Sequence, residues 1–196
     1  TSTAPLSQGR FGHTATLLPN GEVLVTGGFG GVELATAELY EWSTGTWSST
    51  AAMTKTRSGH TATLLGDGRV LVVGGGGVTA EIYDRSTGAW AATGSLAAAP
   101  SRHTTRLLPD GRVLVSSGLS GAADLYNPGT GLWAATGSLT TPVRTRQTAT
   151  LLPNGRVMVA GGTNGLYGGV PDLDSVEVYD PPTGAWTTAG SLLEAR

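Results

Sequence analysis

Short apolar runs alternate with polar turn residues along the whole chain, and one such run recurs four times. The nine residues NGEVLVTGG at 20–28 return as DGRVLVVGG at 67–75, DGRVLVSSG at 110–118 and NGRVMVAGG at 154–162. The apolar residues within each copy are consecutive, which predicts a strand that is covered on both faces. No segment shows sustained helical periodicity, so the pattern predicts an all-β chain.

Each repeat predicts one four-stranded antiparallel sheet. In HTATLLPNGEVLVTGG, at 13–28, two apolar runs flank Asn-Gly. Such pairs tolerate the positive φ of a type I′ turn, which predicts a tight hairpin. A third run, AELYE or AEIYD, leads through a second turn such as STGT or PTGA to a fourth run that opens at a tryptophan.

The aromatic residues fix the period of the repeat. Four tyrosines lie 43, 43 and 53 residues apart, and each is followed seven residues later by a tryptophan: Tyr40, Tyr83, Tyr126 and Tyr179, with Trp47, Trp90, Trp133 and Trp186. Large rings with one polar tip suit a layer between stacked sheets. Four units, at about 10–56, 57–99, 100–143 and 144–196, are therefore predicted to form a single domain over 1–196 as the blades of a β-propeller.

Pairs of glycines end the second run of three units: Gly27 and Gly28, Gly74 and Gly75, Gly161 and Gly162. A missing side chain allows close backbone approach or positive φ. Because no GxGxxG stands between a strand and a helix, we interpret these glycines as structural and not as a phosphate loop.

Composition narrows the function classes. The 196 residues include no cysteine, one lysine (Lys55) and 13% charged residues, with a net charge of -2. Disulfides, thiolate metal sites and thiol nucleophiles are thus excluded, and the scattered arginines argue against a nucleic-acid footprint. The longest apolar stretch, 70–73, predicts no membrane insertion. A surface rich in Ser, Thr, Gly and Ala favours a secreted or cell-surface bacterial protein.

These motifs resemble the kelch repeat: an apolar strand that ends in diglycine, then a tyrosine, then a tryptophan after a turn. RFGHTATLL and RSGHTATLL are most similar to the bacterial, galactose-oxidase-type version. The third unit departs from the pattern with Ser116, Ser117 and Pro100, and the fourth with Gln147. The resemblance implies a copper-radical oxidase only where a cysteine is crosslinked to a tyrosine, so no cofactor is expected here.

The two faces of the predicted propeller differ. The turns between the first and second and between the third and fourth strands are tight, whereas the link from second to third strand varies in length. Function usually sits on such variable loops. Candidate ligand-binding residues on that face are Arg10, Arg57, Arg144, Asn164, Tyr167, Asp172 and Asp174. Two carboxylates lack the 6 to 8 oxygens that calcium takes, so no metal site is predicted.

The arginines and histidines of the repeat have a second interpretation. His13, His60 and His103 around an axis could hold a metal. Alternatively, each Arg and His bonds a carbonyl of the neighbouring blade. We favour the second interpretation, because an identical residue at an identical place in each repeat is what a packing role predicts.

Together these features predict a non-catalytic binding or scaffold module that recognises a protein or a glycan through the variable-loop face. No Ser-His-Asp spacing, HExxH or paired carboxylate indicates catalysis. The alternatives are a sugar-acting enzyme, as the resemblance to kelch-like sugar isomerases implies, or a fragment of a larger kelch-containing secreted enzyme.

Four units are at the low end of the roughly 4 to 8 blades of propellers. TAPLSQGR near the start matches AGSLLEAR at the end, so no strand is left over to complete a shared blade. We expect a homodimer that completes a ring; closure of one chain alone and additional blades from a longer parent chain are the alternatives. Without closure, the outer faces of the first and fourth sheets should expose apolar patches.

Overall fold

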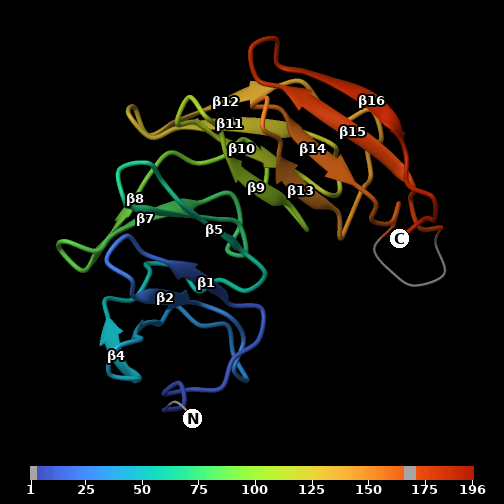
Figure 1. The fold of residues 1–196 in the computed structure, drawn as a ribbon. Helices are drawn as coiled ribbons and strands as arrows, with labels where there is room; N and C mark the ends of the chain where they lie inside the picture. Colours follow the sequence, from blue (N-terminus) through green and yellow to red (C-terminus); the bar gives the residue numbers. More distant parts are fainter. Residues whose placement is uncertain (1–3, 166–170) are drawn as a thin grey trace. The chain divides into compact units, whose positions relative to one another are not determined.

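The computed structural model describes residues 4–165 and 171–196, and every regular element in these two ranges is a strand. The strands form four antiparallel sheets of four, and neighbours along the chain are neighbours in each sheet (Figure 1). The predicted all-β architecture of four four-stranded blades is confirmed. Within the described ranges, no helix is long and apolar enough to cross a membrane.

The four sheets are named blades 1 to 4 in chain order. Blade 1 contains β1 (Thr14–Leu17), β2 (Val23–Thr26), β3 (Ala37–Glu41) and β4 (Thr46–Thr50). Blade 2 contains β5 (Thr61–Leu64), β6 (Val70–Val73), β7 (Ala80–Asp84) and β8 (Ala89–Ala92). Blade 3 contains β9 (Thr104–Leu107), β10 (Val113–Ser116), β11 (Ala123–Asn127) and β12 (Leu132–Thr136). Blade 4 contains β13 (Thr148–Leu151), β14 (Val157–Ala160), β15 (Ser175–Asp180) and β16 (Ala185–Ser191).

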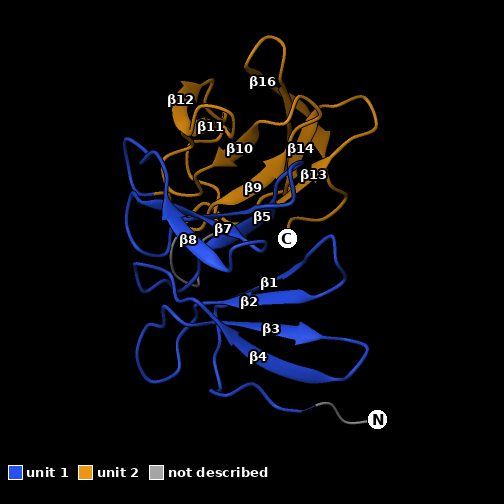
Figure 2. Ribbon diagram, turned by 90° about the vertical axis from the view of Figure 1, so that its left-hand side faces the viewer, with its two compact units in different colours: residues 1–99 blue, residues 100–196 orange. Residues whose placement is uncertain are grey.

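The chain divides into two compact units of two blades each, Thr1–Ala99 and Pro100–Arg196 (Figure 2). The boundary coincides with the predicted boundary between the second and third repeats. A single domain over 1–196 stays a prediction.

In unit 1 the two blades pack face to face through apolar side chains. Leu24 and Leu39 of blade 1 share a buried cluster with Val70, Val72 and Tyr83 of blade 2. All four residues of β6 are fully buried, which confirms that the consecutive apolar run is covered on both faces. Unit 2 repeats the arrangement, with Leu114 and Leu125 of blade 3 in the cluster that contains Val157, Val159 and Tyr179 of blade 4.

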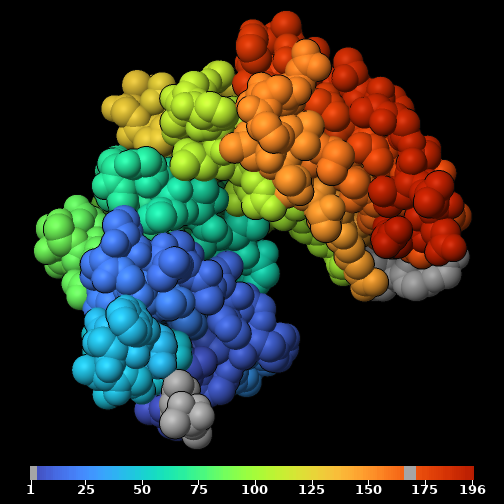
Figure 3. Space-filling model, viewed as in Figure 1, coloured from blue at the N-terminus to red at the C-terminus, as the bar shows by residue number. Residues whose placement is uncertain are grey.

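The tyrosines and tryptophans of the repeat pack in pairs within each blade. Each repeat tyrosine lies directly opposite its tryptophan on the next strand, with ring centroids 4.9 to 5.1 Å apart. The hydroxyl of Tyr83 lies 2.8 Å from Oγ1 of Thr50 in blade 1, and that of Tyr179 lies 2.8 Å from Oγ1 of Thr136 in blade 3. Tyr83 and Tyr179 therefore join adjacent sheets. The turn from β3 to β4, in light blue in Figure 3, lies at the surface, with Trp42 68% exposed.

The hairpin turns correct one prediction. A type I′ turn needs positive φ at both central residues, but the only non-glycine residues with positive φ in the described ranges are Arg102 and Arg146. Instead, the amide of Gly21 donates to the carbonyl of Leu18, and Gly21 alone has positive φ. Pro19 suits this turn, because its fixed φ fits the first central position of a type I turn, which a left-handed glycine then completes. Blade 2 forms the same turn with Gly66 at the proline position.

The diglycine after the second strand permits close approach of the chain that enters the blade. A Cβ on Gly75, where φ is +66°, would lie 2.7 Å from the carbonyl oxygen of Ser58. A side chain at this position would therefore collide with the backbone of the entering chain.

The outer faces of blades 1 and 4 are more exposed than the corresponding inner ones. Val23 and Tyr40 are half-buried, whereas Val70 and Tyr83 at the same positions of blade 2 are fully buried. Met158 of blade 4 is likewise half-buried, although its counterparts in the other blades are fully buried. Each unit thus presents one partly uncovered apolar sheet face.

Candidate functional site

The arginine that precedes the innermost strand is buried inside its own blade. The side chains of Arg10, Arg57 and Arg144 have no exposed surface and are paired with Glu38, Glu81 and Glu177 on the third strand. We call each of these sets an arginine clamp. In blade 2, Nη1 of Arg57 donates to the carbonyls of Gly74 and Thr79 at 2.8 and 2.9 Å.

This geometry corrects the expected partner of the arginines. The guanidinium groups bind carbonyls of their own blade and not of the neighbouring one. The backbone of Arg57 makes the link between blades, because its amide donates to Leu34 and its carbonyl accepts from Gly28. Full burial of the side chains favours the packing interpretation of Arg10, Arg57 and Arg144 over the ligand-binding one.

The clamp glutamates of blades 2 and 4, Glu81 and Glu177, are held in the ionised form. Burial alone would raise the pKa of Glu81, but hydrogen bonds from Thr54 and from the Arg57 guanidinium outweigh it and keep the pKa below its usual range. The pKa of Glu177 is lowered against the same effect of burial by hydrogen bonds from Thr140, Thr141 and Arg144. The sequence did not single out these glutamates.

Blade 3 has no clamp of its own. Pro100 occupies the arginine position, and Asp124 replaces the glutamate. Asp124 is partly exposed, and its side chain makes no hydrogen bond or ion pair with the described residues. Burial raises the pKa of Asp124, with no opposing charge to counter it.

His60 links blades 1 and 2 through hydroxyl groups and not through a carbonyl. Nε2 of His60 in blade 2 lies 2.9 Å from Oγ1 of Thr14 and 3.1 Å from Oγ1 of Thr26, both in blade 1. His103 is buried and His13 is exposed. In the described ranges, no group of three or more His, Cys, Asp and Glu side chains could hold a metal ion.

The long link of blade 4 presents several predicted candidates at the surface. Asn164, Asp172 and Asp174 are all exposed. Thr163 forms isolated bridges with Thr145 and with Asp172, which hold the two ends of the link beside the entry to β13. Tyr167 lies outside the described residues.

Two arginines that sequence reasoning missed lie at the entry to the innermost strands of unit 2. Arg102 and Arg146 occupy the repeat position that is glycine in blades 1 and 2. Their φ angles are +49° and +60°, in the left-handed region that residues other than glycine rarely adopt. Both are exposed, and within the described ranges neither guanidinium makes a hydrogen bond or ion pair. Alignment with Gly12 and Gly59 is the sequence signal that marks them.

On the variable-loop side of unit 1, apolar groups are exposed. Phe11 is 68% exposed and packs against Phe29, with ring centroids 5.3 Å apart. Val32, in the link between β2 and β3, is 64% exposed. Aromatic and aliphatic side chains of this kind are typical of the core of protein interfaces.

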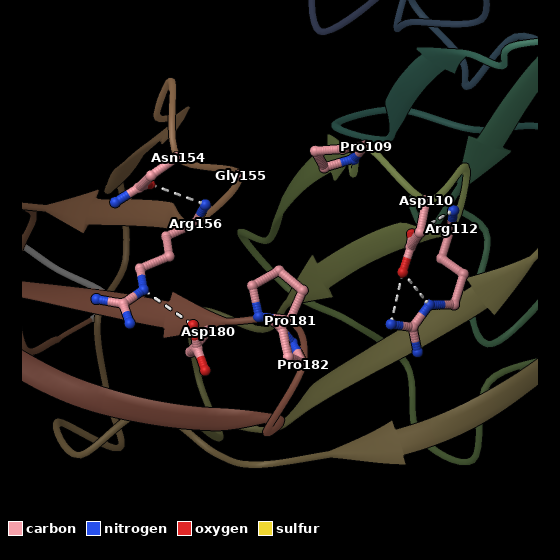
Figure 4. Close-up of a pocket in the computed structure, with 9 residues that line it drawn as sticks. All are labelled: Pro109, Asp110, Arg112, Asn154, Gly155, Arg156, Asp180, Pro181 and Pro182. Carbon is pink, nitrogen blue, oxygen red and sulfur yellow. Dashed lines mark hydrogen bonds and ion pairs between the residues drawn. The ribbon is translucent and has the colours of Figure 1, made fainter.

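The opposite, tight-turn side carries a pocket in each unit. In unit 2 a cavity of about 290 Å³ lies between the turns of blades 3 and 4, and it is lined by Pro109, Asp110, Arg112, Asn154, Gly155, Arg156, Asp180, Pro181 and Pro182. Figure 4 shows the two prolines of blade 4 between two ion pairs, Arg112 with Asp110 and Arg156 with Asp180. In unit 1 the corresponding cavity, of about 420 Å³, contains Arg85, which pairs with Glu22 across the two blades.

The charges of these pockets are balanced within the chain. Hydrogen bonds from Thr183 and Arg156 lower the pKa of Asp180, and the Arg85 guanidinium lowers that of Glu22. Each guanidinium in these pockets therefore already binds a carboxylate. On the variable-loop side of unit 2, by contrast, the guanidinium groups of Arg102 and Arg146 bind no carboxylate among the described residues.

Comparison with known families supports this architecture. Residues 144–193 match the family model of the Kelch motif, and this segment contains all four strands of blade 4. Together with the four four-stranded sheets, the match fits a kelch-repeat propeller. Kelch repeats generally mediate protein binding or scaffolding. A comparison with curated proteins gives no significant match.

Proposed function

We propose that the chain is a non-catalytic binding module whose variable-loop face takes up a protein partner through carboxylate groups of that partner. The observation that carries the proposal is the pair of exposed, unpaired arginines Arg102 and Arg146. An arginine fork binds a carboxylate through two parallel hydrogen bonds, which suits recognition of Asp and Glu side chains.

The backbone at these two positions supports a binding role. For residues with a side chain, the left-handed conformation costs roughly 1–2 kcal/mol. Blades 1 and 2 avoid that cost with Gly12 and Gly59. The amide of Gly59 donates a hydrogen bond to the carbonyl of Gly12 at 2.9 Å. Strain that persists where glycine would relieve it is typical of functional sites. The innermost strands β9 and β13, which these arginines precede, lie side by side in unit 2.

The double variant Arg102→Gly/Arg146→Gly is expected to be more stable than the parent and to lose partner binding. Relief of strain should raise the free energy of unfolding by about 1 kcal/mol, since the entropy of glycine offsets part of the gain. Loss of two charged hydrogen bonds, at about 1.5 kcal/mol each, should weaken binding about a hundredfold. Binders are selected from a library of short random displayed peptides and titrated by fluorescence anisotropy.

Lys55→Ser is the matched control, because it removes one exposed positive charge between β4 and β5 of unit 1. It should leave binding and stability unchanged. Selected peptides without enriched Asp and Glu, or equal binding by the double variant, would contradict the proposal. Binding of heparin but of no peptide would assign the face to an anionic glycan instead.

We also propose that two copies of the chain associate through the outer faces of blades 1 and 4. The half-buried Val23 and Tyr40 belong to the face that packs on the preceding blade in unit 1, and Met158 and Val178 belong to the face that packs on the following one. Within each unit, faces of these two kinds pack against each other, so the two outer faces are expected to fit together in the same way. Association would cover the partly exposed apolar side chains of both.

Light scattering is expected to give a mass near twice the 19.8 kDa of one chain. Met158→Glu places a charge on the outer face of blade 4 and should return the protein to a monomer. Leu193→Glu adds the same charge at a fully exposed side chain and should leave the dimer intact. A mass near 19.8 kDa for the unmodified chain would refute the association.

A further inference from the structure

On the tight-turn side, the two blades of unit 1 meet through one pair of side chains. Glu22 directly precedes β2 of blade 1, and Arg85 directly follows β7 of blade 2. Nη2 of Arg85 donates to Oε1 of Glu22 at 2.9 Å, and Nε donates to the second oxygen of the same carboxylate. The position before the second strand therefore faces the following blade, and the position after the third strand faces the preceding one.

The outer faces of blades 4 and 1 carry an arginine and a tryptophan at these two positions. Arg156 directly precedes β14 of blade 4, and Trp42 directly follows β3 of blade 1. Both strands keep the register of their counterparts in unit 1. The side chain of Arg156 is 52% exposed, and Trp42 is 68% exposed. Each residue thus stands where a packed blade makes its contact, but on a face that no described blade covers.

The guanidinium of Arg156 has room for a further partner. It binds Asp180 through Nε at 2.9 Å, and Nη1 and Nη2 make no hydrogen bond with the described residues. In Figure 4 the two Nη atoms point away from Pro181 and Pro182, and so away from the pocket between blades 3 and 4. This direction matches that of Glu22, which faces the following blade.

The indole of Trp42 covers the turn glycine of its own blade. A Cβ on Gly21 would lie 3.1 Å from Nε1 of the indole. In blades 2 and 4 the corresponding Cβ, on Gly68 or Gly155, would instead meet the proline of the preceding blade at 3.4 Å. A blade that packs on the outer face of blade 1 would therefore bring its own turn proline, Pro153 in blade 4, against the indole.

We propose that, when two copies of the chain associate, the indole of Trp42 in one copy stacks on the guanidinium of Arg156 in the other. The inference rests on the proposed association and names the contact that selects the two faces. A guanidinium binds the face of an indole ring by a cation–π interaction, and the Nη atoms of Arg156 can make it without loss of the Asp180 ion pair. Two like faces would place two indoles or two guanidinium groups together, so the pair favours blade 1 on blade 4.

Dissociation constants of the dimer, measured by sedimentation velocity over a dilution series, test the contact. Arg156→Gln should raise the dissociation constant about fivefold and Trp42→Ala about tenfold, since the indole also loses apolar contact with Pro153. The double variant should be about as weak as Trp42→Ala alone, because the second change has no partner left to remove. Phe11→Ala removes a ring that is equally exposed, at 68%, on the variable-loop side, and it should have no effect.

An exchange of side chains gives the sharper test. Arg156→Glu with Trp42→Arg copies the ion pair of unit 1 onto the outer faces, and Asn154 can donate to the new carboxylate as Asn20 donates to Glu22 at 2.6 Å. Trp42→Arg alone sets two guanidinium groups against each other and should weaken the dimer more than Trp42→Ala does. The combined variant should recover most of the affinity, because opposite charges then meet across the two faces.

The outcomes separate this contact from the association itself. A mass near 19.8 kDa for the unmodified chain would refute both. A dimer in which the two single variants have additive effects, or in which the combined variant is as weak as Trp42→Arg, would overturn the contact and leave the association of the outer faces in place. Both side chains are exposed, so the variants should fold as the unmodified chain does.

Discussion

Replacement of Arg57 by methionine is expected to lower the free energy of unfolding by about 3–5 kcal/mol, as loss of one partner of a buried ion pair does. Glu81 would then be a buried charge without its cation, 1% exposed, and the carbonyls of Gly74 and Thr79 would each lose a donor. Methionine fills a similar volume, so the loss would come from electrostatics and hydrogen bonding and not from a cavity.

Urea unfolding followed by tryptophan fluorescence measures this loss. The double variant Arg57→Met/Glu81→Gln should recover a large part of it, because no buried charge remains. Arg156→Met breaks the exposed pair with Asp180 and should change stability by less than about 1 kcal/mol. If Arg57→Met behaved like Arg156→Met, the clamp would not stabilise the blade.

The clamp also shows how far the sequence could be interpreted. The arginine was visible before the first strand, but its partner was not, because AELYE and AEIYD were interpreted only as strands. A signal was present: the third unit lacks the arginine and also shortens the glutamate to Asp124. Two positions that change together within one chain indicate a contact, and a comparison of the units would have found the pair.

The strands, the double-sided burial of the second strand and the tyrosine–tryptophan layer could be predicted because each repeats four times with the same spacing. The pockets of the tight-turn side could not be predicted in this way. They form between turns of successive blades, and their charge depends on single positions, such as the one that is Arg85 in blade 2 and Pro181 in blade 4. The local sequence does not show which residues of the next blade lie beside such a position. The strain at Arg102 and Arg146 is a backbone property that only the comparison with glycine reveals.

The second large effect is expected at Tyr83. Tyr83→Ala should lower the free energy of unfolding by about 3–5 kcal/mol, as the loss of a large core side chain does. The ring is fully buried between blades 1 and 2, 5.1 Å from the ring of Trp90. Its hydroxyl lies 2.8 Å from Oγ1 of Thr50. Tyr83→Phe removes only this hydrogen bond and should cost about 1 kcal/mol.

Tyr40→Ala is the matched comparison, because Tyr40 packs on Trp47 at nearly the same distance, 5.0 Å, but is only half-buried. Both variants lose a contact with the tryptophan of their own blade, and only Tyr83→Ala also opens a cavity between two described sheets. Tyr40→Ala should therefore cost about half as much, in proportion to the apolar area that each ring buries. Equal losses in the two variants, measured by urea unfolding, would mean that the tyrosine stabilises its own sheet alone and does not join adjacent blades.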